Sequence, residues 1–462
     1  MKEIINIERL ALQGEGVGRL SSGGPDDKKV AFVPYTLPGE TVEARLVEDK
    51  KNYSRWIPTK IETPSSVRVT PRCPVHFSPG SEHFCGGCDW QQLSPDFQKK
   101  AKAELVRETL IRLGGIAKPP MNALLSGPQD WHYRNKIQVP FGVGRGYKLM
   151  GGFYSPGSHD IVEFDDCVIQ PELSVQIFQA VKKFASLAKW HPYEEDRHQG
   201  WLRHVLIRTN EAGQALLALV TTSEQFNDQT RFVNEMRSQF PTLVSIHLNV
   251  QTGKTHRILG LRWVRLWGDD RLEENILGLR LAYSPGSFFQ VNTKAAERLY
   301  EEALRQLDPA ETSVVLDVYC GVGAMTFLAA RKTKFAIGIE ETLSSIRDAK
   351  WNAQQNQIQN VKFVEGSAEK ALAHPAKLWE GYLKQADLFV IVDPPRSGCR
   401  PEVLTALIKL GPKRIVYVSC NPATLARDIK ILAPHYQLKE TTPVDLFPQT
   451  SHIESVSRLD RI

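Results

Sequence analysis

One cysteine in the last third of the sequence has the surroundings of a reactive thiol. Cys420 follows an apolar, β-prone run, Arg414 to Ser419, and precedes Asn421 and Pro422, which can cap and begin a helix. A thiolate beside a helix N-terminus is stabilised, so Cys420 is a candidate nucleophile. The alternative is a structural cysteine that is simply buried.

Three further strand-like runs end in groups that bind or react. Ser313 to Val318 runs into a glycine turn, Lys334 to Glu340 ends in a carboxylate, and Leu388 to Val392 runs into Asp393-Pro394-Pro395-Arg396. The carboxyl ends of parallel strands meet at one edge of a sheet, where α/β proteins bind ligands. We therefore expect a cleft there, with backbone amides of the turn facing the ligand and Glu340 accepting hydrogen bonds from a ribose.

Four other cysteines form a second group: Cys73, Cys85, Cys88 and Cys167. The C-x-x-C pair within it is typical of either a redox motif or two metal ligands. No helical βαβ context surrounds the pair, which favours ligation by four thiolates of an iron-sulfur cluster or of zinc. His76 and His83 keep the zinc alternative open.

The chain divides into three predicted domains. Residues 1–66 consist of short alternating segments separated by turns, a pattern typical of a small OB-like β-barrel that binds RNA. Residues 67–285 mix strand-like and helical runs and are interpreted as a central α+β domain. Residues 286–462 hold the strand ends described above and are expected to form an α/β domain with a doubly wound sheet.

Two features of the central region bear on its contacts. Pro95 to Leu113 carries apolar positions among many charges and is predicted to be an exposed amphipathic helix. Arg134 and Lys136 lie on the next expected strand, Tyr133 to Gly142, where they could touch a polyanion. Solvated surface charge is the interpretation we favour for these two residues.

Charge and cysteine content limit the possible partners and the cellular compartment of the protein. The 462 residues carry a net charge of +6, which permits an acidic partner such as RNA without requiring one. Seven cysteines, an odd number, fit a reducing compartment better than a disulfide framework. The sequence shows neither a signal-peptide core nor an uncharged apolar run of about 18 residues, so we expect a cytoplasmic protein without a membrane span.

Several segments together resemble the S-adenosylmethionine-dependent RNA 5-methyluridine methyltransferases. They are Ser284 to Asn292, Leu316 to Gly323, Asp393 to Gly398, Tyr417 to Asp428 and Asp445 to Ser455. The similarity extends over nearly the whole chain. It implies a Rossmann-like methyltransferase domain at 286–462, an N-terminal TRAM barrel that binds RNA, and a four-iron four-sulfur (4Fe-4S) cluster held by the four cysteines.

The resemblance also implies roles for single residues. Gln290, Tyr319, Glu340 and Asp393 would contact the cofactor S-adenosylmethionine. Cys420 would be the nucleophile and Glu454 the base. One departure is the loop between Cys73 and Cys85, which is longer than expected in the family.

The expected reaction is methyl transfer to carbon 5 of a uridine in RNA, with 23S rRNA as the favoured substrate, through a covalent cysteine-uracil intermediate. Phe288 or Phe289 would stack where the flipped base was, or would simply pack in the core. Alternatives are a uridine in tRNA, another acceptor such as cytosine or a protein side chain, and a non-catalytic RNA-binding protein with a methyltransferase fold. No obligate protein partner is implied.

Overall fold

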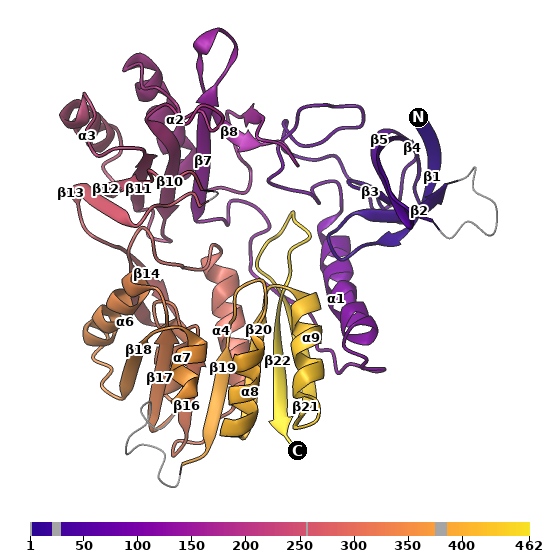
Figure 1. The fold of residues 1–462 in the computed structure, drawn as a ribbon, viewed down its shortest axis with the longest axis vertical. Coiled ribbons are helices and arrows are strands. Elements are labelled where there is room, and N and C mark those ends of the chain that lie inside the picture. Colours follow the sequence, from indigo (N-terminus) through magenta and orange to yellow (C-terminus); the bar gives the residue numbers. More distant parts are fainter. Residues whose placement is uncertain (1, 21–28, 256, 375–385) are drawn as a thin grey trace.

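A computed structural model describes residues 2–20, 29–255, 257–374 and 386–462 of the chain. It contains a small barrel, a central sheet with helices on one face, and a large sheet with helices on both faces (Figure 1). This arrangement confirms the predicted Rossmann-like domain preceded by an N-terminal barrel and a central α+β region. The exact limits proposed for the three domains stay a prediction.

The N-terminal barrel is closed in the strand order β1-β2-β3-β5-β4. Alternate residues point inward, as the period of two in the sequence requires, and Ile5, Val33, Val42 and Trp56 are buried in its core. The strands are β1 (Lys2–Leu10), β2 (Gly16–Leu20), β3 (Val30–Val33), β4 (Thr41–Asp49) and β5 (Tyr53–Thr63).

The central sheet has seven strands in the order β13-β12-β11-β10-β7-β8-β9. Helices α2 (Glu172–Leu187) and α3 (Gln229–Gln239) cover one face, and their apolar sides pack on alternate residues of the strands. The strands are β7 (Lys136–Val143), β8 (Leu149–Tyr154), β9 (Ile161–Glu163), β10 (Leu202–Thr209), β11 (Ala215–Thr221), β12 (Leu243–Val250) and β13 (Arg262–Gly268). A short 3-10 helix, Arg145–Tyr147, lies between β7 and β8.

The large sheet has eight strands in the order β18-β17-β16-β19-β20-β22-β21-β6. The first five are parallel, whereas β22 runs antiparallel to β20 and to β21. The strands are β6 (Leu125–Ser126), β16 (Val314–Val318), β17 (Phe335–Glu340), β18 (Val361–Glu365), β19 (Leu388–Val392), β20 (Arg414–Ser419), β21 (Tyr436–Asp445) and β22 (Glu454–Arg461). A hairpin, β14 (Leu272–Ile276) and β15 (Leu279–Tyr283), precedes this domain.

Helices form a layer on each face of the large sheet. One apolar core joins the strands to α4 (Thr293–Leu307) and α5 (Ala324–Ala330), and α6 (Leu343–Gln355) packs against β15, β17 and β18. The other core joins them to α7 (Ala368–Ala373), α8 (Pro401–Leu410) and α9 (Pro422–Leu432). The four inner strands of the parallel part, β17, β16, β19 and β20, are thereby buried, which explains their nearly continuous apolar sequences, whereas the edge strand β18 is half-buried.

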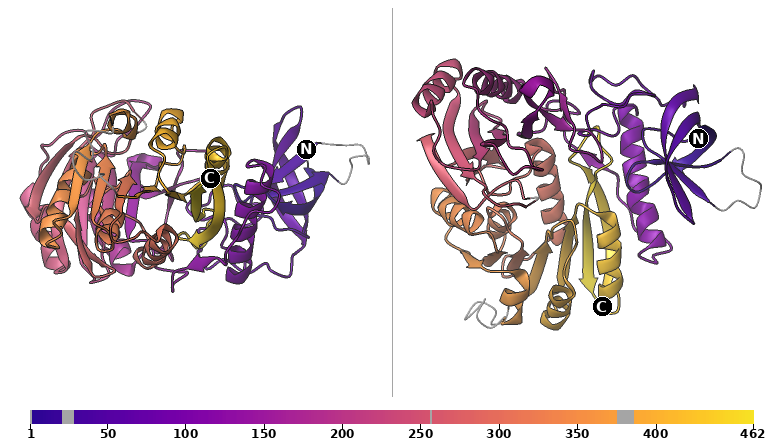
Figure 2. Two further views of the ribbon diagram at one scale, coloured as in Figure 1. Left: turned by 90° about the horizontal axis from the view of Figure 1, so that it is seen from below. Right: turned by 45° about the horizontal axis from the view of Figure 1, so that its top comes forward.

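The sequence predicts an exposed amphipathic helix at α1 (Pro95–Arg112), but only one side of this helix is exposed and the other is buried on two neighbours. It lies between the barrel and the large sheet, packed against α9 and β21 (Figure 2). Val106 and Leu110 join the core of the large sheet, and Leu105 packs with Leu10 and Leu37 of the barrel. The many charged residues of this helix suggested an exposed position. One of them, Lys102, is instead fully buried in an ion pair.

A search of the described helices finds none long and apolar enough to cross a membrane.

Candidate functional site

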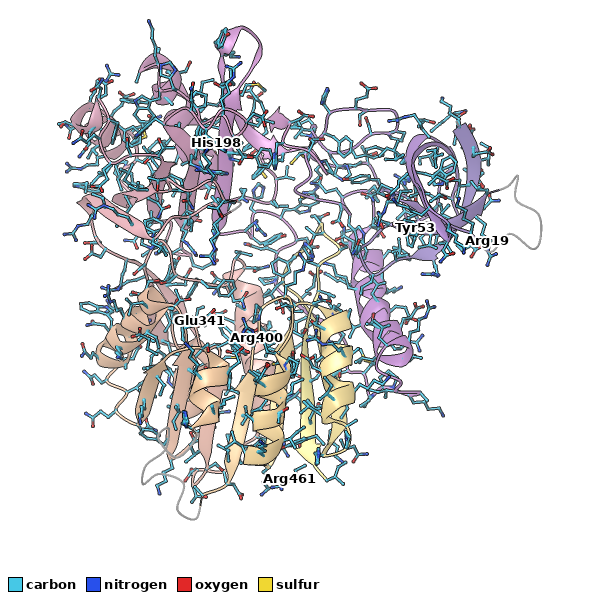
Figure 3. All side chains as sticks on the ribbon, in the orientation of Figure 1. Arg19, Tyr53, His198, Glu341, Arg400 and Arg461 are labelled. Atoms are coloured by element: carbon cyan, nitrogen blue, oxygen red, sulfur yellow. The ribbon has the colours of Figure 1, made fainter. Side chains whose placement is uncertain are left out.

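The predicted binding and reacting groups gather at the carboxyl edge of the large sheet. Figure 3 marks this edge by Glu341, which follows β17, and Arg400, which precedes α8. Because β22 is antiparallel, its first residue lies at the same edge as the last residues of the parallel strands. The edge therefore unites the ends of β16, β17, β19 and β20 with the start of β22.

The glycine turn after β16 leaves room beside its backbone. Tyr319 adopts a φ of 72°, a left-handed conformation that is unusual for a tyrosine and is common at binding sites. Gly321 also has positive φ, and a side-chain carbon added there would meet no atom within 4 Å. A ligand can thus approach this backbone closely at the start of α5.

Glu340, at the end of β17, braces the same turn. One carboxylate oxygen accepts a hydrogen bond from the Gly321 amide (3.1 Å) and the other from the Thr342 amide (2.7 Å). The carboxylate remains half-exposed, so it can accept further hydrogen bonds from a ligand hydroxyl. The role expected from the sequence, a contact to the cofactor ribose, stays a prediction.

Asp393 follows β19 and lies near a second carboxylate. Burial and the charge of Asp317 raise the pKa of Asp393 to about 7. Asp317 lies in the interior of β16, where Thr326 donates a hydrogen bond to it (2.6 Å), and burial raises its pKa to about 7 as well. Two carboxylates with raised pKa values favour a cationic or hydrogen-bond-donating ligand at this edge.

Cys420 and Glu454 face each other across two neighbouring strands. Ser419 of β20 pairs with Ser455 of β22, so the residues just beyond this pair, Cys420 and Glu454, come together. Cys420 is half-buried, and Glu454 is 5% exposed. Asn421 caps α9 by accepting a hydrogen bond from the Ala423 amide (3.1 Å), as its position in the sequence predicted.

The thiolate of Cys420 is not stabilised in the free protein, contrary to the expectation from the helix N-terminus. Burial and the carboxylates of Glu454 and Asp393 raise its pKa to about 12, and only Arg396 among the neighbouring charges opposes them. Burial and Asp393 likewise raise the pKa of Glu454 well above its usual range. Desolvation and like charge therefore outweigh the helix end, and the free protein favours the protonated forms.

The segment between β21 and β22 rises from the large sheet towards the central domain (Figure 1). We call residues 446–453 the β21–β22 loop. Lys102 of α1 anchors its base by an ion pair with Asp445 (2.7 Å) and a hydrogen bond to the Phe447 carbonyl (2.9 Å). Asp89 accepts a hydrogen bond from the Ser451 amide (2.9 Å), and Glu454 follows directly after this loop.

A second ordered segment, Ser284 to Asn292, crosses the same region. Asp348 of α6 holds its start, accepting hydrogen bonds from the Ser284 amide (2.7 Å) and from the Ser287 hydroxyl (2.7 Å), and it also pairs with Arg271. Gln290, further along, is buried. The segment is therefore fixed by a helix that also packs on β17 and β18.

The two phenylalanines of this segment have different surroundings. Phe289 is 3% exposed and stacks on Tyr283, with ring centroids 4.2 Å apart. Phe288 is 64% exposed. Core packing thus accounts for Phe289, whereas Phe288 is free to contact a base.

The four cysteines predicted as metal ligands surround one cavity of about 250 Å³. Burial raises the pKa of Cys85 to about 11 and that of Cys167 to about 12, so these thiols favour the protonated form without a cation beside them. His76 also lines the cavity, whereas His83 does not. Across the described residues, no group of three or more His, Cys, Asp or Glu side chains is arranged to hold a metal ion.

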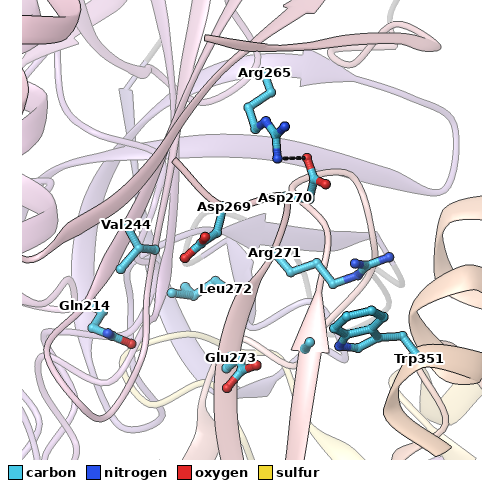
Figure 4. A pocket seen from close by; sticks show the side chains of 10 residues that line it. Gln214, Val244, Arg265, Asp269, Asp270, Arg271, Leu272, Glu273 and Trp351 are labelled. Atoms are coloured by element: carbon cyan, nitrogen blue, oxygen red, sulfur yellow. Dashed lines mark ion pairs between the residues drawn. The ribbon is translucent and has the colours of Figure 1, made fainter. Parts of the chain in front are cut away.

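A larger cavity, of about 460 Å³, lies between β13 and α6 and contains none of the predicted site residues (Figure 4). Arg265 pairs with Asp270 across it (2.9 Å), and Arg271 lies over the ring of Trp351 at 4.9 Å. Arg271 also pairs with Asp348, and Glu273 pairs with Arg280, so most of the charged side chains that line the cavity already have ion-pair partners. We assign no function to it.

The structure adds three residues that the sequence did not single out: Lys102, Asp348 and His452. The His452 ring nitrogen Nδ1 lies 2.9 Å from Arg396, and burial together with Arg396 lowers its pKa to about 4. Each of the three acts through partners that are distant in the sequence. A lysine, an aspartate and a histidine in such segments carry no local pattern that would have identified them.

The fold and this edge define the class of the protein, an α/β enzyme of the Rossmann-like methyltransferase type joined to an N-terminal barrel. Residues 234–462 match the family described as tRNA (Uracil-5-)-methyltransferase, and residues 4–55 match the TRAM domain. The chain has the fold of Pyrococcus abyssi tRNA (uracil-54, C5)-methyltransferase in complex with S-adenosyl-L-homocysteine, with a TM-score of 0.75 and 26% identity over 98% of this chain and 99% of that one.

Two bacterial relatives match over almost their full length. A Listeria monocytogenes (serotype 4b, strain F2365) protein described as an uncharacterized RNA methyltransferase is 39% identical over 98% of this chain and 96% of its own. A Bacillus cereus (strain ATCC 10987 / NRS 248) protein of the same description is 37% identical over 100% and 97%. The chain belongs to this family of S-adenosylmethionine-dependent RNA (uracil-5-)-methyltransferases.

Proposed function

We propose that the protein methylates carbon 5 of a uridine in 23S rRNA through a covalent bond between Cys420 and the uracil ring. The observation that carries the proposal is the proximity of Cys420 and Glu454, which lie just beyond the Ser419–Ser455 pair of β20 and β22, at the same sheet edge as the glycine turn of β16. A nucleophile and a base at one edge of the sheet are the two groups that this chemistry needs.

Carbon 5 of uracil is a poor nucleophile until a thiolate adds to carbon 6. Cys420 loses its proton to solvent and its thiolate forms that carbon-sulfur bond, while the electron pair of the ring double bond moves to give an enolate. S-adenosylmethionine, when bound, would supply a methyl group on a positively charged sulfur, and carbon 5 of the enolate takes that methyl group. Glu454, in its ionised carboxylate form, then accepts the carbon 5 proton, and the Cys420 thiolate leaves as the double bond re-forms.

The proposed cofactor contacts are Gln290, Tyr319, Glu340 and Asp393. Glu340 offers a half-exposed carboxylate for ribose hydroxyls, and the open side of Gly321 leaves space next to it. Asp393 and Asp317 provide negative charge for a cationic ligand. The target base has to leave its stack to reach such a site, and the exposed ring of Phe288 is placed to stack in its stead.

The four cysteines are proposed to hold a 4Fe-4S cluster, with zinc as the alternative. All four thiols line one cavity, which supports a shared inorganic group because a cation beside a buried thiol stabilises its thiolate, although the described side chains do not themselves form a ligand set. Anaerobic purification followed by a visible absorption spectrum and metal analysis distinguishes the two. A colourless protein that contains zinc contradicts the cluster.

The covalent mechanism is tested with Cys420→Ala and with RNA that contains 5-fluorouridine. The fluorine cannot leave as a cation, so the wild-type protein should remain bonded to the RNA after methyl transfer, whereas the alanine variant should form no adduct. Titration with S-adenosylhomocysteine should give the same affinity for both proteins. A wild-type protein that turns over without ever giving an adduct would falsify the mechanism.

The similarity to an enzyme named for tRNA favours tRNA as the second candidate substrate. Mapping of methylated uridines in cellular RNA with and without the gene separates the two. Loss of a 5-methyluridine from 23S rRNA supports the proposal, and loss from tRNA alone replaces it. Loss of 5-methylcytidine, or no change in any RNA, would point to another acceptor or to a non-catalytic role.

A further inference from the structure

Two cations lie directly opposite each other on the second face of the central sheet, near the ends of its strands β7 and β10. Lys136 of β7 pairs in register with Arg208 of β10, and Arg134 lies two residues before Lys136. Like charges at directly opposed positions of antiparallel strands repel each other and destabilise the sheet. Neither Lys136 nor Arg208 forms an ion pair with any residue in the described ranges, so no carboxylate within those ranges pairs with either cation to offset this repulsion.

Arg208 is buried, which makes its unpaired charge more costly. Its side chain is 2% exposed and donates one hydrogen bond, from Nη2 to the Ser287 carbonyl (2.7 Å). The guanidinium lies over the ring of Tyr283 at 5.2 Å, but Nε and Nη1 have no hydrogen-bond partner among the residues that the structure describes. A buried guanidinium with unmet donors is costly, and this cost is recovered when an anion accepts those hydrogen bonds.

Lys136 keeps the site in contact with solvent because it is only half-buried. Burial and the charges of Arg208 and Arg134 lower its pKa to about 7. An anion that binds between Lys136 and Arg208 would favour the charged lysine and remove the repulsion at the same time.

The two cations border the proposed uridine site. Asn135, between Arg134 and Lys136, donates hydrogen bonds from its backbone to the Val291 carbonyl (2.8 Å) and from its side chain to the Gln290 carbonyl (3.0 Å). The partner of Arg208, Ser287, directly precedes the exposed Phe288. The cations thus adjoin the segment that carries the proposed cofactor contact and the proposed stacking ring.

We propose that Lys136 and Arg208 bind a backbone phosphate of the RNA next to the target uridine, an assignment that rests on the proposed function. A phosphodiester presents two anionic oxygens, which can accept from the lysine ammonium and from the free guanidinium donors together. Such contacts fix the position of a nucleic acid strand without reading its sequence. They would hold the strand while the uridine leaves its stack.

The first test compares Lys136→Gln with Lys183→Gln, which removes the same charge from an exposed position on α2, on the opposite face of the same sheet. The probe is a short single-stranded RNA with one uridine, and binding is followed by fluorescence anisotropy from about 50 to 200 mM salt. Lys136→Gln should bind about fivefold more weakly near 0.1 M salt, with a log-log salt slope shallower by about 0.7, the value for one phosphate contact. Equal slopes in the two variants would overturn the proposal.

A second test locates the phosphate. Each phosphodiester beside the uridine is replaced in turn by a neutral methylphosphonate, and the affinity of wild-type protein should fall at one linkage. Lys136→Gln should lose less affinity at that linkage than the wild type does, because only Arg208 then remains to contact the phosphate. A full additional loss in the variant would show that the phosphate is held elsewhere.

A third measurement separates RNA from the other anion available, the carboxylate of the cofactor. Calorimetric titration with S-adenosylhomocysteine should give equal affinities for wild type and Lys136→Gln. Weaker cofactor binding together with unchanged RNA binding would assign the cations to that carboxylate and overturn the phosphate site. None of these measurements needs turnover, so they succeed or fail independently of whether carbon 5 of uridine is the methylated atom.

Discussion

Cys420, the proposed nucleophile, is kept protonated by its surroundings. The proposed base, Glu454, and a proposed cofactor contact, Asp393, are the charges that raise the pKa of the thiol in addition to burial. Arg396 is the neighbouring charge that lowers it. The fraction of Cys420 present as thiolate therefore depends on how far Arg396 and bound ligands offset the charges of the two carboxylates.

This balance predicts the pH dependence of kcat/KM, which reports ionisations of the free enzyme. Below a pKa of about 12 the thiolate fraction grows about tenfold per pH unit, so kcat/KM should rise from neutral into alkaline pH. Arg396→Gln removes the charge that lowers this pKa and should displace the profile to higher pH. Lys409→Gln, exposed in the last turn of α8 and distant from the edge, is the control; identical profiles for the two variants would contradict the role of Arg396.

Substitution of Asp348 should lower the stability of the fold and also weaken cofactor binding. Asp348→Asn leaves Arg271 without its buried partner and removes acceptors from Ser284 and Ser287, so we expect a loss of about 3 kcal/mol in the free energy of unfolding. The segment that carries Gln290 should also loosen, which weakens S-adenosylhomocysteine binding in calorimetry. Glu273→Gln, which removes an exposed partner of Arg280, is the control and should change neither quantity by much. Unaltered cofactor affinity in Asp348→Asn would show that Asp348 stabilises the fold only.

Residues at strand ends were predictable from the sequence, because a local pattern of apolar strand, turn and helix brings them to one edge. Cys420, Glu340 and Asp393 lie where that pattern placed them. The pKa of Cys420 could not be predicted in this way, since it depends on burial and on Glu454, which another strand supplies. The burial of Lys102 was likewise hidden, because its partner Asp445 lies 343 residues further along the chain.

At the scale of elements, α1 and the β21–β22 loop form one unit. The Gln98 side chain donates a hydrogen bond to the Gln449 side chain (3.0 Å) and accepts one from the Gln449 amide (2.9 Å), in addition to the Lys102 contacts at the base of the loop. Tyr133 donates a further hydrogen bond to the Pro448 carbonyl (2.8 Å). A helix from the first quarter of the chain thus fixes the loop that leads into Glu454.

Lys102→Met should break this unit. The variant leaves Asp445 buried without a partner, at a cost of about 3–5 kcal/mol in the free energy of unfolding measured with urea. The double variant Lys102→Met/Asp445→Asn should recover part of that loss, because no unpaired charge then remains buried. If the double variant has a lower free energy of unfolding than Lys102→Met alone, packing of the lysine stem, rather than its charge, holds the loop.

For the whole molecule, the barrel is joined to the rest by a buried ion pair. Glu40 of the barrel is 1% exposed and accepts hydrogen bonds from Arg68 (2.8 Å) and from the Leu37 amide (2.8 Å). Arg68 belongs to the segment that leads from the barrel to the cysteines. The barrel is therefore held in one orientation relative to the chain that follows it.

Glu40→Gln should loosen this junction without unfolding the large sheet. We expect faster amide hydrogen exchange in residues 35–40 and 65–70, with unchanged exchange in β16 and β19, because opening is local. Glu43→Gln alters an exposed barrel ion pair and should leave the exchange of both segments unchanged. Uniform acceleration across the large sheet would show instead that the barrel stabilises the entire protein.

The cluster of Leu10, Leu37, Trp90, Leu93 and Leu105 determines how this enzyme can be re-engineered. It joins the barrel, the cysteine-bearing segment and α1, the helix that anchors the loop before Glu454. If a foreign barrel replaced this one, it would therefore pack poorly against α1 unless it carried leucines equivalent to Leu10 and Leu37. The barrel is therefore not a separable module, because leucines on its wall belong to the same cluster as the helix that anchors the loop before Glu454.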